Sequence, residues 1–260
     1  MFRSKCNRPD PMTMDLPSSI AASRLIAQQR AIEVTAGNLA NANTPGFRTV
    51  RLHFSDWLSR QTNADVPPGG RVVAYTQDRA TWRETQPGSL TSTGNPFDLA
   101  LTGDGYFTVD TKRGPRLTRD GRFTPTVDGR LTDASGNPVL DSAGRPIQLA
   151  PNDINVSIAG DGTISGINGQ IGKIGVVKPD DPMQLKAEGG TLFESRSPTS
   201  PVIAPGVVQG MVEGSNVQPV LELTRMMNEH RQFEFVTQFI QAEADRQKSA
   251  IDKILSPNNR

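Results

Sequence analysis

Apolar residues recur at alternating spacings of three and four near both ends of the chain. The first periodic segment runs from residue 18 to residue 41, and the second from residue 216 to residue 255. This is the heptad spacing of helices that pack one apolar stripe against a partner. It predicts a long coiled-coil-type helix at each end. The periodic positions are Ala22, Leu25, Gln29, Ile32, Ala36 and Leu39 in the first segment, and Leu223, Met226, His230, Phe233, Thr237, Ile240, Ala244, Gln247, Ile251 and Ile254 in the second.

Residues with capping chemistry stand at the start of each periodic segment. Ser18 or Ser19 is suited to be the N-cap of the first helix, and Asn216 that of the second. Pro219 then falls in the first turn of the second helix, where its missing N–H costs little. We therefore expect the C-terminal helix to follow directly after Asn216.

The first helix ends in an Asn-rich stretch, NLANANTPGF, at residues 38–47. Pro45 cannot continue the helical hydrogen bonding, and Gly46 accepts a reversed backbone. Phe47 is the one large apolar residue of the junction. The asparagines suit a crowded polymer contact, since each offers a donor and an acceptor; they suit the cap of a fraying helix end equally well. These three asparagines are Asn38, Asn41 and Asn43.

Between the helices the period changes to that of strands. Phe97, Leu99 and Leu101 alternate with Asp98 and Ala100. Four Asp-Gly pairs and one Asn-Gly pair supply the positive φ angles of tight turns. A β-rich, hairpin-built region is therefore expected at residues 72–212, entered through the Pro/Gly-rich stretch at 61–71.

The expected fold class is α+β, with the two heptad helices flanking this central β region. The expected division is an unstructured extension at 1–13, a helix with its junction and linker at 14–71, a β-rich outer domain at 72–212, and a helix at 213–260. The opening residues are detached from the first helix, so Met12 or Met14 is an alternative start.

Composition narrows the function. The net charge of +1 leaves no basic field for nucleic acid, and no apolar run suits membrane insertion or a cleaved signal peptide. The single cysteine, Cys6, has no partner for a disulfide or a zinc site. The two histidines, His53 and His230, lie in no catalytic motif, and the Asp-Gly stretches are better explained as turns than as phosphate loops. We therefore expect no enzyme activity, catalytic site, cofactor or metal.

The two stripes differ in length, so the helices cannot fully cover each other. An apolar stripe exposed to water is unfavourable, so the surplus predicts packing against other subunits. The sequence thus indicates a structural building block of an assembly.

Several motifs, in order, resemble the bacterial flagellar basal-body rod and hook family: NLANANTPGFR, TGNPFDLALTGDGYFTV, LTRDGRF, DGRLTDASGNPVL, VEGSNVQPV and HRQFE. Within the family they are most similar to proximal rod proteins. Gly37 and Leu117 depart from the family pattern. The alternatives are a distal-rod or hook-type axial protein and, more remotely, a secreted adhesive or carbohydrate-binding β protein.

The resemblance implies a periplasmic axial subunit of the basal body, exported by the flagellar type III apparatus without signal cleavage. Its partners would be copies of itself and other proximal and distal rod proteins. It also implies that the Asn-rich motif ends the first helix and that GSNV begins the returning helix. The residues expected to serve assembly are Leu25, Ile32, Asn38, Leu39, Asn41, Asn43, Thr44, Pro45, Gly46, Phe47, Asn216, Val217, Leu223, Met226, Phe233, Ile240 and Ile251.

Overall fold

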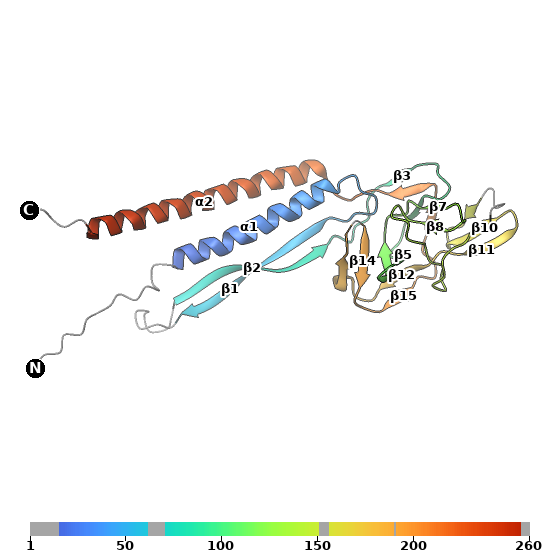
Figure 1. Ribbon diagram of the computed structural model, residues 1–260, viewed down its shortest axis with the longest axis horizontal. Helices are drawn as coiled ribbons and strands as arrows, with labels where there is room; N and C mark the ends of the chain where they lie inside the picture. The colour runs from blue at the N-terminus through green and yellow to red at the C-terminus, as the bar shows by residue number, and fades with distance from the viewer. Residues whose placement is uncertain (1–15, 62–70, 151–155, 190, 256–260) are drawn as a thin grey trace, which may run out of the picture. The chain divides into compact units, whose positions relative to one another are not determined.

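The computed structural model describes residues 16–61, 71–150, 156–189 and 191–255 (Figure 1). Two helices, one near each end of the chain, flank a β-rich central region, so the α+β class is confirmed. The helices are α1 (Leu16–Ala40) and α2 (Pro219–Leu255). The expected extension at 1–13 lies outside the described residues, as does most of the Pro/Gly-rich stretch before residue 71.

Within the described residues, seventeen strands lie between the helices; β1 and β2 have 12 and 13 residues, and the others have two to six. They are β1 (Val50–Gln61), β2 (Arg71–Arg83), β3 (Leu90–Ser92), β4 (Leu99–Leu101), β5 (Tyr106–Thr111), β6 (Gly114–Thr118), β7 (Thr124–Pro125), β8 (Leu131–Thr132), β9 (Ser157–Ile158), β10 (Thr163–Gly166), β11 (Gly169–Lys173), β12 (Val176–Pro179), β13 (Leu185–Ala187), β14 (Leu192–Ser195), β15 (Thr199–Pro201), β16 (Val207–Gln209) and β17 (Met211–Glu213), with a 3₁₀ turn, η1, at Pro182–Gln184.

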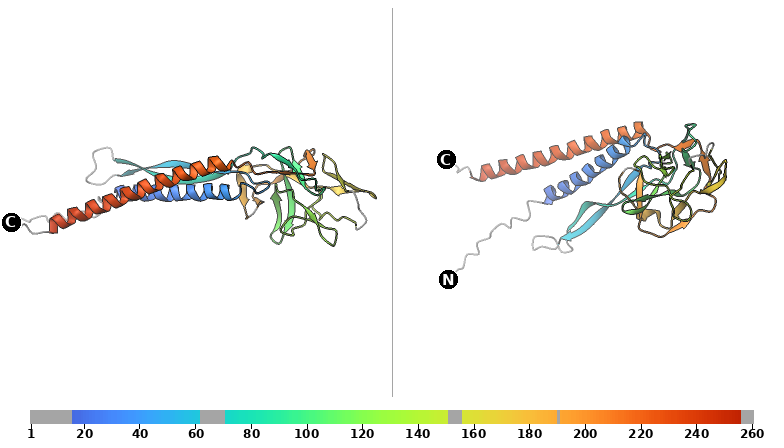
Figure 2. Two further views of the ribbon diagram at one scale, coloured as in Figure 1. Left: turned by 90° about the horizontal axis from the view of Figure 1, so that it is seen from above. Right: turned by 45° about the vertical axis from the view of Figure 1, so that its right-hand side comes forward.

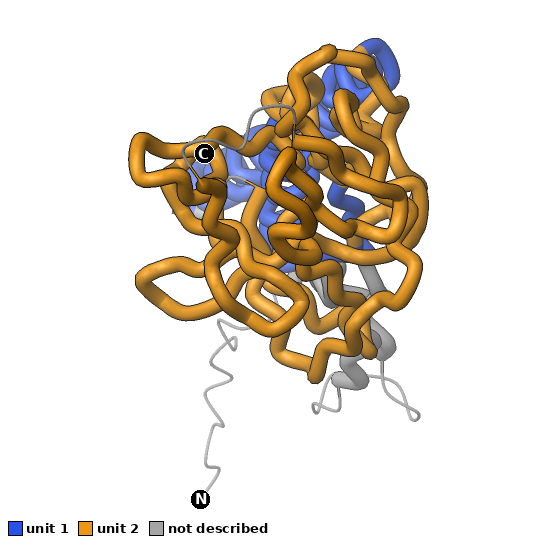
Figure 3. The backbone as a smooth tube through the Cα atoms, turned by 90° about the vertical axis from the view of Figure 1, so that its right-hand side faces the viewer, with its two compact units in different colours: residues 1–37, 50–82, 220–260 blue, residues 38–49, 83–219 orange. Residues whose placement is uncertain are grey.

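The chain forms two compact units (Figure 3). The helical unit comprises residues 1–37, 50–82 and 220–260, so far as they are described, and the β unit comprises 38–49 and 83–219. The chain therefore passes from one unit to the other four times. Within the helical unit, α1 lies between α2 and the β1–β2 pair (Figures 1 and 2).

The β unit is built around a six-stranded sheet with the order β13-β14-β6-β5-β12-β15, beside a three-stranded sheet, β11-β10-β9. Its core is continuous. Phe107 and Phe123 pack edge to face at its centre, with ring centroids 5.2 Å apart. Leu99 and Leu101 are fully buried here, but so are Ala100 and, largely, Asp98. Strand β4 is thus buried on both faces. The alternation in the sequence correctly indicated a strand, but neither face of that strand is exposed to solvent.

The turn glycines act in two ways. Gly105, Gly129, Gly162 and Gly169 adopt positive φ, as the turn motifs predict. Gly121 does not; a Cβ there would lie 1.7 Å from the carbonyl oxygen of Leu99. The fourth Asp-Gly pair is therefore required by close backbone approach rather than by a left-handed turn.

The helix starts differ from those expected. Helix α1 begins at Leu16, before Ser18 and Ser19, so neither serine is its N-cap. Helix α2 begins at Pro219, which confirms the proline in the first turn. Asn216 lies three residues before the helix, and its side chain binds elsewhere, as described below.

The buried stripe of α2 also differs in phase from the predicted one. Glu222 and Val236 are buried, and the remaining residues of this stripe are partly covered: Met226, Glu229, Phe233, Ile240, Glu243 and Gln247. The period of three and four is present, but Leu223, His230, Thr237 and Ala244 are exposed. Acidic residues occupy inner positions that the sequence pattern assigned to other side chains.

Candidate functional site

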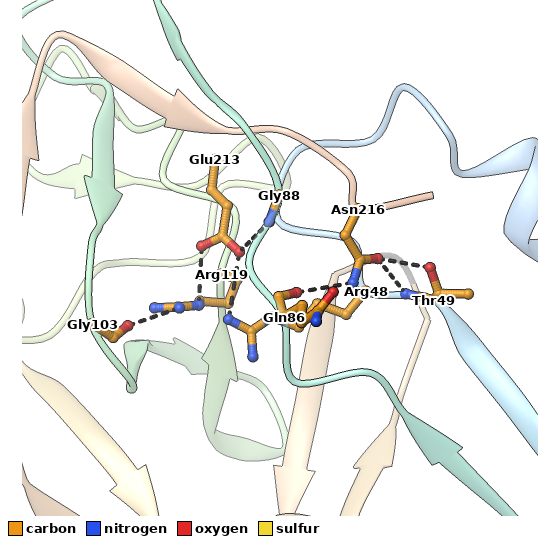
Figure 4. Close-up of polar contacts among 8 residues, drawn as sticks. All are labelled: Arg48, Thr49, Gln86, Gly88, Gly103, Arg119, Glu213 and Asn216. Carbon is orange, nitrogen blue, oxygen red and sulfur yellow. Dashed lines mark hydrogen bonds and ion pairs between the residues drawn. The ribbon is translucent and has the colours of Figure 1, made fainter. Parts of the chain in front are cut away.

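Segments from three distant parts of the chain meet within the β unit (Figure 4). The Gly46 amide donates to the Glu213 carbonyl at 2.8 Å, and the Asn216 amide donates to the Phe47 carbonyl at 3.3 Å. The Glu84 amide donates to the carbonyl of Thr49 at 3.0 Å. We call residues 46–49, 83–89 and 213–216, together with Arg119, the junction clamp. It brings the end of the Asn-rich motif into direct contact with the GSN motif.

Asn216 crosslinks all three segments through its side chain. Its Oδ1 accepts hydrogen bonds from the backbone amide and the hydroxyl of Thr49, at 2.8 and 2.7 Å, and its Nδ2 donates to the Gln86 carbonyl at 2.9 Å. The prediction that Asn216 is the N-cap of α2 is therefore wrong. The short amide is used in tertiary contacts, because it can donate and accept at once.

A buried ion cluster lies beside Asn216 (Figure 4). Glu213 Oε1 is 3.5 Å from Arg48 Nη2, and Glu213 Oε2 is 3.1 Å from Arg119 Nε. The second contact is an ion pair without hydrogen-bond alignment. The side chains of Glu213 and Arg119 are only 1% and 2% exposed. The Gly88 amide also donates to Glu213, at 3.4 Å. One carboxylate therefore serves two guanidinium groups.

Burial sets the electrostatics of this cluster. Desolvation lowers the pKa of Arg119 from its ordinary value, although the charge of Glu213 opposes that shift. Arg119 Nη2 donates to the Gly103 carbonyl at 2.9 Å, whereas Arg119 Nη1 and Arg48 Nε are buried without a hydrogen bond. The stability of the cluster therefore depends strongly on Glu213. Without its carboxylate, two desolvated guanidinium groups would have no counter-charge.

Glycines let the backbones of the clamp approach closely. Gly46 has a φ of +69°, and a Cβ there would lie 2.4 Å from the carbonyl carbon of Arg119. A Cβ on Gly88 would lie 1.9 Å from the Gly214 carbonyl oxygen. Both glycines are therefore required by geometry. The sequence predicted that Pro45 and Gly46 end the first helix, but α1 already ends at Ala40, and Gly46 closes the run of turns that follows.

Phe47 packs inside the β unit, where it is 9% exposed. The Arg83 guanidinium lies 5.8 Å from the centroid of the Phe47 ring and 4.8 Å from that of Phe193. Burial lowers the pKa of Arg83. Phe47 thus stabilises the single chain, a contribution that the sequence interpretation had assigned to the assembled state.

The Asn-rich stretch continues from α1 as a run of turns. The amides of Asn41 and Thr44 donate to the carbonyls of Asn38 and Asn41, each at 3.1 Å, and the Thr44 hydroxyl donates to Asn41 Oδ1 at 3.2 Å. Asn38 is buried, Asn41 is partly covered, and Asn43 is exposed. Local hydrogen bonding therefore accounts for part of the motif, while Asn43 has its side chain turned to solvent.

The remaining residues expected to serve assembly do not share one environment. Pro45, Leu25, Ile32, Leu39, Met226, Phe233 and Ile240 are partly covered, Val217 is buried, and Leu223 and Ile251 are 46% and 50% exposed. The inner stripe of α2 instead makes polar contacts within the helical unit. Glu222 lies 2.7 Å from Arg51 and 2.8 Å from Arg225, and the Thr35 hydroxyl donates to Glu229 at 3.2 Å.

Sequence reasoning missed Glu213, Arg119 and Glu222, because a buried ionised residue carries no local signal that separates it from a surface one. No catalytic arrangement stands out in the clamp. Among the described residues, no cluster of three or more His, Cys, Asp or Glu side chains is arranged to hold a metal ion. No described helix combines the length and apolar character required to span a membrane.

Comparison with known proteins places these features in context. Three family models match: "Flagella basal body rod protein" over residues 19–48, "Flagellar hook protein FlgE/F/G D1 domain" over 100–166, and "Flagellar basal body rod FlgEFG protein C-terminal" over 208–253. The first and third cover α1 with the Asn-rich motif and the GSN motif with α2.

The relatives extend over nearly the whole chain. The flagellar basal-body rod protein FlgF of Caulobacter vibrioides is 35% identical over 243 residues, which cover 93% of this chain and 98% of the relative. FlgF of Mesorhizobium japonicum is 36% identical, covering 89% and 95% of the two chains. The rod protein FlgG of Agrobacterium fabrum is 31% identical, covering 91% and 98%.

Proposed function

Because the chain belongs to the flagellar basal-body rod protein family, we infer that it is a structural subunit of the rod, of the FlgF type. The observation that carries this inference is the similarity to FlgF proteins along nearly the full length, through both helices and the region between them. These relatives are structural proteins, which agrees with a role without catalysis. Membership of the family also supports assembly with other rod proteins.

We propose further that the subunit occupies the proximal rod in the periplasm and contacts copies of itself as well as proximal and distal rod proteins. Export by the flagellar type III apparatus without signal cleavage belongs to the same proposal. A distal-rod or hook-type position is the second candidate, because FlgG proteins are also similar over most of the chain. Counting copies per isolated rod separates the two, since a short proximal segment needs few.

The proposed polymerisation surface is the coiled-coil-type stripes of the two helices. Exposed apolar side chains support it: Leu223 and Ile251 of the predicted stripe, with Phe235 and Phe239 beside them, are all at least 46% exposed. Burying such side chains between subunits removes apolar area from water. The Asn-rich motif, through exposed Asn43, belongs to the proposed contact region.

The domain division expected from the sequence stands as part of the proposal, with an outer domain at 72–212 carried by the terminal segments. Limited proteolysis of the purified chain tests it. A resistant fragment within those bounds supports the division, and a fragment that retains both helices contradicts it.

The test of the function uses cells lacking their own rod subunit of this type. The wild-type chain is expected to restore flagellation and to co-purify with detergent-extracted basal bodies. Ile32→Asp and Ile240→Asp each place a carboxylate on a predicted stripe, where burial of an unpaired charge is costly. Both variants are expected to be exported but not incorporated.

The control for these variants needs an exposed position. Glu243 lies outside the predicted heptad positions but is unsuitable, since its side chain is 14% exposed and lies 2.6 Å from Arg246. Glu234, with a side chain 59% exposed, is suitable, so Glu234→Lys is the matched variant. Far-UV circular dichroism checks that each purified variant retains its helix content. Normal incorporation of both Asp variants contradicts polymerisation through the stripes, and absence of the wild-type chain from basal bodies contradicts the function.

A further inference from the structure

The two helices of the helical unit enclose a groove of about 260 Å³, which we call the helix groove. It is lined by Arg24 and Gln28 of α1 and by Arg231, Gln232, Phe235 and Val236 of α2. Val236 forms a covered floor, whereas Phe235, at its rim, is 71% exposed. The groove therefore offers an apolar surface between two guanidinium groups.

The arginines of the groove lack acidic partners. Among the described residues, neither Arg24 nor Arg231 takes part in an ion pair, and the two like charges line the same groove. Gln28 Oε1 is buried there without a hydrogen-bond donor. Like charges placed close together repel, and a carboxylate between them would reverse the sign of that interaction. The site thus has the charge complementary to an acidic side chain.

We propose that the helix groove binds the distal part of α2 from a second copy of the chain, with Asp245 between the arginines. This inference rests on the proposed function and names a contact within that assembly. Asp245 is exposed and takes part in no ion pair or hydrogen bond with described residues.

Asp245 is identified by elimination among the described carboxylates of the two helices. Each of the others has a partner within the chain: Glu33 contacts Arg30, Glu222 contacts Arg51 and Arg225, Glu229 contacts Thr35, Glu234 contacts His230, Glu243 contacts Arg246, and Asp252 also makes a polar contact. Only Asp245 is available without breaking an existing interaction.

The occupant must come from another copy. Asp245 lies 14 residues beyond Arg231 on the same continuous helix, a separation of roughly 21 Å along its axis at 1.5 Å per residue. Its own groove is therefore out of reach. A contact between different surfaces of two copies is heterologous, and it leaves a free groove on one copy and a free Asp245 on the other. Such a contact can continue from subunit to subunit, as an axial structure requires.

Charge reversal with rescue tests the pairing. Arg231→Glu and Asp245→Arg are expressed singly and together in cells lacking their own subunit of this type, and incorporation is measured by immunoblot of isolated basal bodies. Each single variant is expected to reduce incorporation about tenfold or more, because it places like charges together. The double variant restores opposite charges and is expected to return to within about threefold of wild type. Lys253→Glu, an exposed charge reversal in the last turn of α2, is the matched control.

A cross-link reports the contact directly. In a Cys6→Ser background, Gln232→Cys in the groove and Ala242→Cys, one turn before Asp245, are expected to form a disulfide-linked dimer in assembled basal bodies. Circular dichroism of the purified single variants should match wild type.

Normal incorporation of both single variants overturns the proposal, as does a double variant no better than the singles, or the absence of the cross-link. These outcomes leave the proposed function intact if the wild-type chain enters basal bodies. Failure of the wild-type chain to enter them contradicts the function itself.

Discussion

Replacing Glu213 by Gln tests whether the buried ion cluster holds the junction clamp together. The substitution retains the size of the side chain and one acceptor oxygen but removes the charge that faces Arg48 and Arg119. It also brings an amide donor into contact with guanidinium donors. The side chains of Glu213 and Arg119 are only 1% and 2% exposed. Water therefore cannot solvate the unpaired guanidinium groups unless the clamp opens.

The expected loss is about 3 kcal/mol, the lower end of the cost of breaking a buried ion pair. The β unit has about 150 residues, and for a domain of that size this loss corresponds to a fall in melting temperature of about 6–12 °C. Differential scanning calorimetry at neutral pH measures it. Tryptophan fluorescence is unsuitable, because Trp57 and Trp82 both belong to the helical unit.

Two further variants sharpen the result. Asp104→Asn removes an ion pair with Lys178 whose side chains are 71% and 53% exposed, and it is expected to leave the melting temperature nearly unchanged. Adding Arg48→Gln to Glu213→Gln should cost less than the sum of the two single changes, since one stranded cation disappears. A Glu213→Gln protein that melts within about 2 °C of wild type would refute the reasoning, because a shift that small falls short of the cost of an unpaired buried charge.

Three other outcomes are expected. Phe47→Ala should destabilise the β unit by about 3 kcal/mol in the isolated chain through loss of buried apolar contacts, measurable by the same calorimetry; an unchanged melting temperature would contradict its packing role. Gly88→Ala should lower the melting temperature because its Cβ meets backbone, whereas Gly37→Ala, with open space around it inside α1, should raise helix stability by about 0.5–1 kcal/mol; equal effects would contradict the close approach. Burial raises the pKa of Glu229, so protonation of this carboxyl favours the folded state. The helical unit should therefore gain stability, relative to Glu229→Gln, as pH falls through the folded-state pKa. Thermal melts of both proteins across that pH range check the difference, and parallel stability curves would contradict it.

Periodicity alone predicted the helices and the β centre, because the 3.6- and 2-residue repeats follow from backbone geometry. It failed on the phase of α2. The apolar identity of Leu223 suggested the inner face. Glu222 is buried there instead, because Arg51 and Arg225 both pair with its Oε1 atom. A hydrophobicity pattern considers each side chain by itself, so it cannot reveal ion-pair partners that lie elsewhere in the sequence.

The tertiary contacts of the site were also beyond the sequence. Asn216 has the composition of an N-cap, and nothing local reveals that Thr49 and Gln86 compete for its amide. Strands β1 and β2 are different, since a signal existed: Val50, Leu52 and Phe54 alternate in a stretch that the sequence interpretation treated as junction. The sequence interpretation missed this strand because it extended the linker back from the Pro/Gly-rich stretch that follows.

The contact between Thr49 and Asn216 spans 167 residues of chain, so it cannot form until long after Thr49 has been synthesised. At about 5–20 residues per second, a ribosome needs roughly 10–30 s to supply Asn216 after Thr49 has been made. During that interval Phe47 and the cations of the clamp have no C-terminal partner. The nascent chain is therefore exposed to premature association for most of its synthesis, and the clamp closes only when the last fifth of the polypeptide begins to emerge.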